Sequence, residues 1–194
     1  MADPLSRDIV VAAARAMIAE RGLDAVSLRG LSGSLGVTAP ALYAYVTDKR
    51  DLLRAVAEFE FGRLIEVFDA ISDADPIARM RAYSRAYIDY AVSNPELFRT
   101  MFLFPPEMVL SGLVDDDLPI ASKAFEVPFG AITDAIASGL LPAETDPLMA
   151  ALTMWTATHG AADVLLLGLA FDPAGAEQLV SAVLDTVIAG LRHP

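Results

Sequence analysis

The chain has 194 residues, a formal net charge of −12 and a hydrophobic fraction of 55%. Its mean hydropathy of +0.46 is high for a soluble monomer, so we expect a large apolar face that a second copy covers. The absence of cysteine excludes disulfides and thiolate metal sites. The uncharged, apolar stretch at residues 147–162 is shorter than the roughly 20 apolar residues of a membrane span, and the N-terminus lacks a secretory pattern. These features predict a cytoplasmic protein that has no cofactor and contacts no membrane.

The charge is unevenly distributed along the chain. Residues 1–54 carry seven basic and six acidic side chains, whereas residues 55–194 carry seven basic and twenty acidic ones. A polyanion would be repelled everywhere except at the nearly neutral N-terminal part, which favours a single docking orientation. The alternative is an acidic surface that only keeps the protein soluble.

The hydrophobic periodicity is helical throughout, which predicts an all-α fold of about nine helices. Capping and breaking residues set the expected limits: Ser27 and Thr38 cap helices, Gly36 ends one, and Asn94-Pro95 breaks another. The expected helices cover approximately residues 4–21, 28–35, 39–45, 48–71, 76–93, 96–102, 118–138, 146–169 and 173–191. We expect a loop at residues 104–117, where prolines, a glycine and three aspartates cluster.

Residues 28–46 have the pattern of a helix-turn-helix, two short helices joined by Gly36-Val37. Four apolar side chains would pack the two helices together, namely Leu31, Leu35, Val37 and Leu42. We therefore predict a three-helix DNA-binding domain at residues 1–50 and a larger helical domain for ligand binding and dimerisation at residues 51–194.

Small side chains follow the turn, and they would allow close approach to base edges in the major groove. Thr38 can hydrogen-bond a base, while Tyr43, Tyr45 and Lys49 suit phosphate contacts. Each has a simpler alternative, because Thr38 can act only as a helix cap and Tyr43 can pack in the core.

The order of these residues resembles the signature of the tetracycline-repressor (TetR) family. The matching positions are Val37, Thr38, Leu42, Tyr43, Tyr45, Lys49, Leu52 and Leu53, with Arg7, Ala13, Gly22, Arg29, Gly30, Leu31 and Gly36 upstream. The resemblance covers residues 7–54. It implies DNA contacts by Arg29, Thr38, Ala39, Pro40, Tyr43, Tyr45 and Lys49. Departures from the pattern are Val46, where phenylalanine is usual, and Ser32 and Gly33 inside the second helix.

The C-terminal half resembles a TetR subgroup with a tryptophan and histidine-glycine motif, present here as Trp155 and His159-Gly160. Aromatic and sulfur side chains could line an effector pocket, and we expect it to contain Tyr87, Tyr90, Phe98, Met101, Phe102, Phe125, Phe129, Trp155 and His159. The alternative is that these residues form core and that His159 bonds Asp163.

The last two helices are broadly apolar, as a four-helix bundle between two copies requires. The expected interface residues are Leu165, Leu169, Val180, Val183, Leu184, Val187, Ile188 and Leu191. A homodimer would present two DNA-binding domains to a palindromic operator on double-stranded DNA.

The resemblance implies a transcriptional repressor that a small apolar effector releases from its operator. Two alternatives remain: a dimeric small-molecule sensor with degenerate DNA binding, and an all-α enzyme with an aromatic pocket. The sequence disfavours an enzyme, because it has two histidines, no nucleophile motif and no metal-ligand cluster.

Overall fold

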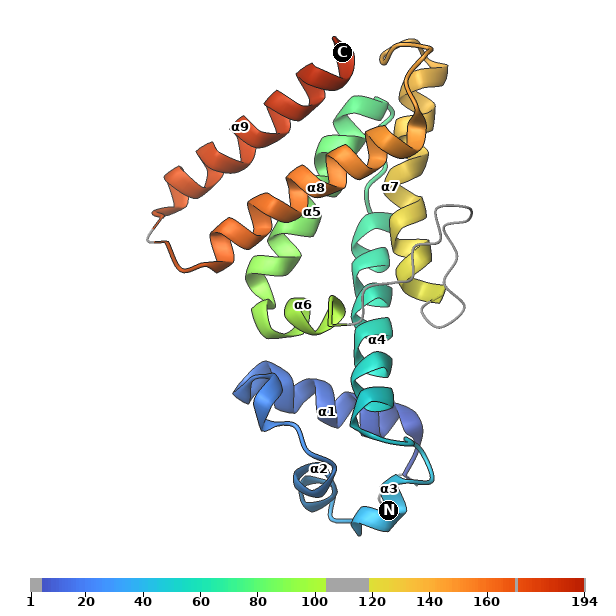
Figure 1. Cartoon of the computed structure of the whole chain (residues 1–194), viewed down its shortest axis with the longest axis vertical. Coiled ribbons are helices and arrows are strands. Elements are labelled where there is room, and N and C mark those ends of the chain that lie inside the picture. Colours follow the sequence, from blue (N-terminus) through green and yellow to red (C-terminus); the bar gives the residue numbers. More distant parts are fainter. Residues whose placement is uncertain (1–4, 104–118, 170, 194) are drawn as a thin grey trace. The chain divides into compact units, whose positions relative to one another are not determined.

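The computed structural model describes residues 5–103, 119–169 and 171–193. These residues form α helices, one 3-10 helix and no strand, which confirms the all-α prediction (Figure 1). The elements are α1 (Arg7–Arg21), η1 (Leu23–Ala25), α2 (Leu28–Ser34), α3 (Ala39–Leu42), α4 (Lys49–Asp69), α5 (Pro76–Ser93), α6 (Pro95–Met101), α7 (Pro119–Ala137), α8 (Pro147–Leu166) and α9 (Pro173–Arg192). The loop expected at residues 104–117 lies outside the described residues.

The helix ends follow the capping residues. The Ser27 hydroxyl accepts a hydrogen bond from the Gly30 amide at 3.0 Å, and the Asp172 carboxylate accepts one from the Gly175 amide at 2.7 Å. Gly36 has φ +67°, a conformation that side chains disfavour, directly after α2 ends. Local side-chain chemistry therefore fixes these limits.

Helix α3 is shorter than predicted. It ends at Leu42 instead of Tyr45, because the amides of Tyr45 and Val46 both bond to the Leu42 carbonyl, at 2.9 and 3.0 Å. The chain therefore turns at residues 43–45 and enters α4 four residues later.

The chain forms two compact units. Unit 1 comprises Met1–Gly62 and Asn94–Ala121, and unit 2 comprises Arg63–Ser93 and Ser122–Pro194. Helices α4 and α7 contribute residues to both. The compact units are thus divided differently from the domains expected at residues 1–50 and 51–194, which stay a prediction; α4 continues through residue 50, and α6 belongs to unit 1.

The core of unit 1 joins the helix-turn-helix to α1, α4 and α6. Its fully buried side chains include Ile18 of α1, Leu31 of α2, Leu42 of α3 and Leu52 of α4. Leu35 and Val37, which were expected to pack between the two short helices, lie partly buried against this cluster as predicted.

Unit 2 is built on α5, α8 and α9. The buried face of α9 carries Val180, Leu184 and Ile188, which are at most 6% exposed. They were expected to face a partner copy; within this chain, α9 contacts α8 and α5 of its own unit. Of the expected interface residues, Leu165, Val183, Val187 and Leu191 are half-buried and Leu169 is 54% exposed.

Two ion pairs fix α9 to α5 within unit 2. Arg81 meets Asp185 at 2.6 Å, and Arg85 meets Glu177 at 2.7 Å. Among the described helices, α9 is also long and apolar enough to cross a membrane by length and composition, with a mean hydropathy of 1.3 and 17% of the window buried. The sequence expectation had considered only the uncharged stretch in α8. In the folded unit, the buried face of α9 explains part of its high hydropathy. The ion pairs to α5 show that the same helix also makes polar contacts within unit 2.

Candidate nucleic-acid interface

Residues 38–44 present one buried leucine and an otherwise accessible surface. Leu42 is 0% exposed and anchors α3 in the core of unit 1, whereas the Tyr43 side chain is 57% exposed. The other predicted DNA contacts fall into two groups: Arg29, Thr38, Pro40 and Lys49 are exposed, and Ala39 and Tyr45 are half-buried. The fold therefore places these side chains where a large ligand could reach them.

The simpler alternatives for Thr38 and Tyr43 find no support. Thr38 occupies the N-cap position of α3, but its side chain makes no capping hydrogen bond and is exposed. Tyr43 is too exposed to be a core residue. Both side chains are thus available to an external partner, which a cap or a core residue would not be.

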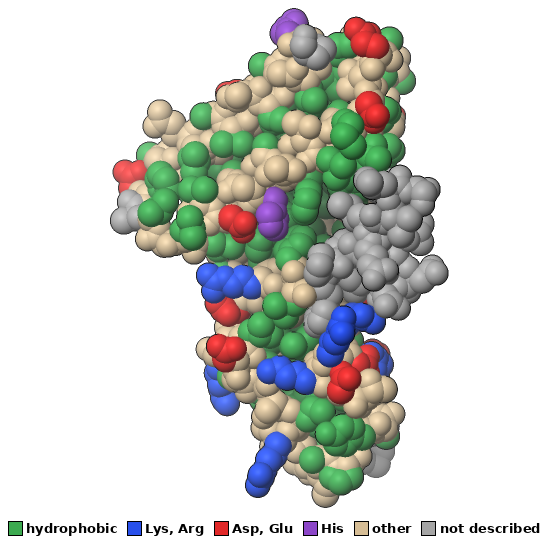
Figure 2. Space-filling model, in the orientation of Figure 1, with side chains coloured by type: hydrophobic (Ala, Val, Ile, Leu, Met, Phe, Trp, Pro, Cys, Tyr) green, Lys and Arg blue, Asp and Glu red, His purple; other side chains and the backbone are tan. Residues whose placement is uncertain are grey.

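Charge does not accumulate on unit 1 as a uniform basic stripe. On the face shown in Figure 2, basic side chains over the α1–α3 region lie among acidic and hydrophobic ones. This agrees with the nearly balanced charge of residues 1–54. Contacts with a polyanion would then depend on individual side chains at defined positions rather than on a broad positive field.

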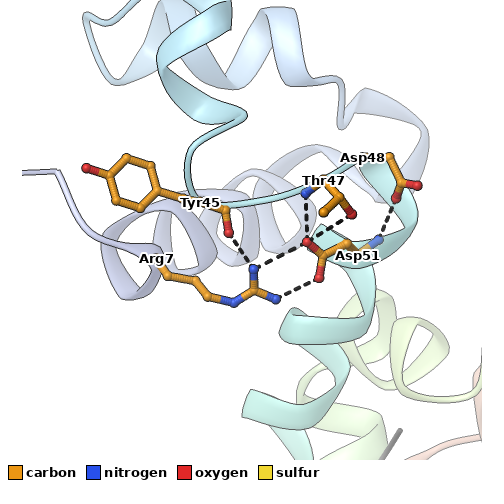
Figure 3. A network of polar contacts seen from close by, with 5 residues as sticks. All are labelled: Arg7, Tyr45, Thr47, Asp48 and Asp51. Atoms are coloured by element: carbon orange, nitrogen blue, oxygen red, sulfur yellow. Dashed lines mark hydrogen bonds and ion pairs between the residues drawn. The ribbon is translucent and has the colours of Figure 1, made fainter.

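A network of polar contacts supports the turn after α3 (Figure 3). These contacts were not predicted from the sequence. The Arg7 guanidinium donates to the backbone carbonyl of Tyr45 and to both carboxylate oxygens of Asp51, at 2.7 and 3.3 Å. The same carboxylate accepts the Thr47 amide at 2.8 Å, and Asp48 accepts the Asp51 amide at 2.8 Å. The network thus connects the start of α1, the turn and the first turn of α4.

The electrostatics of the pair favour its charged form. The hydrogen bond from Arg7 holds the pKa of the Asp51 carboxyl below its usual value, and the same bond raises the pKa of Arg7. Because the folded-state pKa of Asp51 is depressed, its stabilising contribution is present above the unfolded-state pKa and is lost as the pH falls through the folded-state value. Arg7 and Asp51 therefore stay paired at neutral pH.

Gly33 gives a first testable prediction. A Cβ built at this exposed position in α2 has no atom within 4 Å, and φ is not positive. Gly33→Ala is therefore expected to raise the free energy of unfolding by about 0.5–1 kcal/mol, since alanine loses less backbone entropy in a helix. Urea denaturation measures this. Gly36→Ala is the matched control and should destabilise, because Gly36 has φ +67°.

The residues expected to line an effector pocket are divided between the two units. Unit 1 contains Phe98, Met101 and Phe102, of which the first two are at most 2% exposed, and unit 2 contains Tyr87, Tyr90, Phe125, Phe129, Trp155 and His159. A groove of about 390 Å³ in unit 1, lined by residues of α1 and α4 with Ile120, contains none of the nine. Within the part of the chain that is described, no group of acidic, histidine or cysteine residues could hold a metal ion.

Within unit 2, Tyr87, Trp155 and His159 meet. The Tyr87 hydroxyl lies 2.6 Å from Nδ1 of His159, and the rings of Trp155 and His159 are 5.2 Å apart at their centroids. Nε2 of His159 lies 3.6 Å from a carboxylate oxygen of Asp163, the residue that the alternative interpretation pairs with it. Burial raises the pKa of the Tyr87 hydroxyl, which is therefore neutral.

The helical architecture described above is shared with known proteins. An all-α chain with an N-terminal helix-turn-helix belongs to the broad class of DNA-binding regulators. The profile described as "Bacterial regulatory proteins, tetR family" matches residues 10–56, and the profile described as "Tetracyclin repressor-like, C-terminal domain" matches residues 80–187. The second match alone covers more than half of the chain, so the protein belongs to the tetracycline-repressor family of bacterial regulatory proteins.

Individual relatives are more distant. The uncharacterized HTH-type transcriptional regulator YobS of Bacillus subtilis is 29% identical over 104 residues, so the match spans 51% of this chain and about half, 52%, of that relative. A protein of unknown function from Rhodococcus sp. RHA1 has a TM-score of 0.79 at 26% identity, over 96% of this chain and 95% of its own. A TetR variant of Acinetobacter baumannii in complex with minocycline has a TM-score of 0.68 at 22% identity, over 98% and 100%. The last similarity shows the fold alone.

Proposed function

We propose that the protein is a cytoplasmic transcriptional repressor that binds a palindromic operator as a homodimer and is released by a small apolar effector. The observation that carries this proposal is the surface of residues 38–44. Its side chains are accessible to solvent, except that Leu42 is buried and anchors the segment in the core of unit 1. Thr38, Ala39, Pro40 and Tyr43 would face base edges in the major groove. Arg29, Tyr45 and Lys49 would contact phosphates and set the register.

Selection of bound sequences from random DNA tests the function most directly. Two DNA-binding units related by a two-fold axis should select inverted half-sites about 34–36 Å apart, or a multiple of that distance. Failure to enrich any sequence would contradict the proposal and favour a sensor with degenerate DNA binding.

Lys49 provides a second test of the DNA-binding surface. It is exposed at the first position of α4, and Lys49→Ala is expected to weaken binding to all sequences alike. The slope of log affinity against log salt should also fall by about one, because one phosphate contact is lost. Fluorescence anisotropy at several salt concentrations measures both. Arg21→Ala, which removes an exposed charge at the far end of α1, should leave the slope unchanged.

The dimer would form through the exposed apolar surfaces of unit 2. Leu167 and Leu169 beside the end of α8 are 72% and 54% exposed. The exposed face of α8 also carries Gly160, where a Cβ would meet nothing within 4 Å. Small and apolar residues on one face allow close approach of a second helix. These observations support the α8 and α9 surfaces as the interface between copies.

The effector would bind in unit 2 near Tyr87, Trp155 and His159. Their contacts place a neutral hydroxyl and an imidazole among aromatic rings, a combination that suits an apolar molecule with one hydrogen-bonding group. The fold similarity to a minocycline-bound regulator supports a ligand site in this type of domain. A molecule that binds the wild-type protein but leaves operator affinity unchanged would contradict release by that molecule, because a ligand shifts an equilibrium only by its differential affinity.

A further inference from the structure

The turn between α3 and α4 is held by two side chains that are not among the expected DNA contacts, Arg7 and Asp51. Residues 43–45 have left α3, so their backbone is not stabilised by helical hydrogen bonds alone. Arg7 satisfies the carbonyl of Tyr45, and Asp51 satisfies the amide and, at 3.3 Å, the hydroxyl of Thr47. Val46, between them, is 1% exposed and anchors the turn in the core.

The residues adjacent to this turn are those expected to contact phosphate. Tyr45 carries the bonded carbonyl, and Lys49 follows Thr47 by two residues. Backbone displacement here would move both side chains at once. Contacts that fix the register of a protein on DNA require defined positions, and a shift of about 1 Å in a positioning element has large effects on binding geometry.

We propose that Arg7 and Asp51 are positioning residues for DNA binding, which hold the turn after α3 so that Tyr45 and Lys49 reach the phosphate backbone. Arg7 has both terminal nitrogens engaged, on the Tyr45 carbonyl and on Asp51. The guanidinium is therefore paired within unit 1. The Asp51 carboxylate accepts hydrogen bonds from Arg7 and from the Thr47 amide, and these bonds hold the turn. Its negative charge, by contrast, would repel DNA.

This opposition gives a test in which two explanations predict opposite signs. Asp51→Ala removes a negative charge two residues from Lys49, so electrostatics alone predicts tighter binding to DNA. Loss of positioning predicts that affinity for the selected operator falls by about tenfold or more. Asp24→Ala is the matched control, because it removes an exposed acidic charge from the same unit, and it should leave affinity unchanged or slightly higher. Unchanged or tighter operator binding by Asp51→Ala would overturn the proposal.

Asp51→Asn separates hydrogen bonding from charge. It removes the same charge as alanine but keeps a carbonyl that can accept the Thr47 amide. We expect a smaller loss of operator affinity than for Asp51→Ala, measured on protein whose circular dichroism spectrum matches wild type. Equal affinities for the two variants would overturn the proposal, and the comparison remains available if the alanine variant is less stable.

The salt dependence distinguishes positioning by Arg7 from direct contact. Arg7→Ala is expected to lower operator affinity about tenfold with the salt slope unchanged, and Arg7→Lys should be intermediate because it keeps the charge but not the forked geometry. A slope that falls by about one would show a phosphate contact and overturn the positioning role. The inference rests on the proposed DNA binding: a wild-type protein that selects no operator would contradict that function, whereas unaffected Arg7 and Asp51 variants would contradict only this inference.

Discussion

Arg15→Ala is expected to lower the free energy of unfolding by about 3 kcal/mol or more. Arg15 on α1 pairs with Glu60 on α4, whose side chain is 0% exposed. Removing the arginine takes away the ion pair that offsets part of the desolvation cost of this buried carboxylate. Thermal or urea unfolding followed by circular dichroism measures the change.

Two further variants test whether loss of the ion pair to Glu60 explains this result. Arg63→Ala breaks the exposed pair between Arg63 and Glu66 and should change stability by less than about 1 kcal/mol. The double variant Arg15→Ala/Glu60→Gln removes the buried charge as well, so it should recover part of the loss. A double variant that is less stable than Arg15→Ala alone would contradict the explanation by the lost ion pair of a buried carboxylate.

Local signals in the sequence predicted the fold well. Ser27 caps α2 as its position before an apolar periodic segment indicates, and Gly36 ends α2 with positive φ. These features depend on side chains within three residues of the backbone groups they satisfy. The same reasoning failed at α3, because the turn at Tyr45 is determined by hydrogen bonds to Leu42 and by Arg7 from the start of the chain.

The contacts that complete the candidate site are distant in sequence. Arg7 and Asp51 are separated by 44 positions, and Arg15 and Glu60 by 45. Both pairs join α1 to α4, and no periodicity of either helix links one to the other. Arg7 was recognised only as part of a family pattern, which gave no physical role. Such pairs become visible only when the packing of α1 on α4 is known.

The periodicity of the sequence also does not show which apolar residues of α9 contact the same chain and which would contact a second copy. The helix has a broad stripe, and the expectation assigned all of it to a partner copy. The structure shows that Leu184, at its centre, is 0% exposed and packs within unit 2. A helix that contacts both its own chain and a second copy is apolar on two adjacent faces, and a single sequence does not distinguish them.

The face of α9 that remains predicts where the second copy binds. Four half-buried side chains recur every four residues beside the buried stripe, namely Leu179, Val183, Val187 and Leu191. Asp185 and Glu177 are held by arginines of α5 and so do not occupy this face as free charges. The proposed homodimer therefore places Val187 near the centre of a contact between copies.

Val187→Glu is expected to convert the dimer into a monomer, because a carboxylate at the centre of an apolar contact would be buried without a partner in each copy. Light scattering after size-exclusion chromatography measures the mass. Operator binding at the same concentration should be lost, since a single unit contacts only one half-site. Ala189→Glu introduces the same charge at an exposed position on a different face of α9 and should remain dimeric. A dimeric Val187→Glu protein would show that the interface lies elsewhere, and so would an equal effect of Ala189→Glu. In either case, the apolar face of α9 would not form the assembly that the proposed DNA recognition requires.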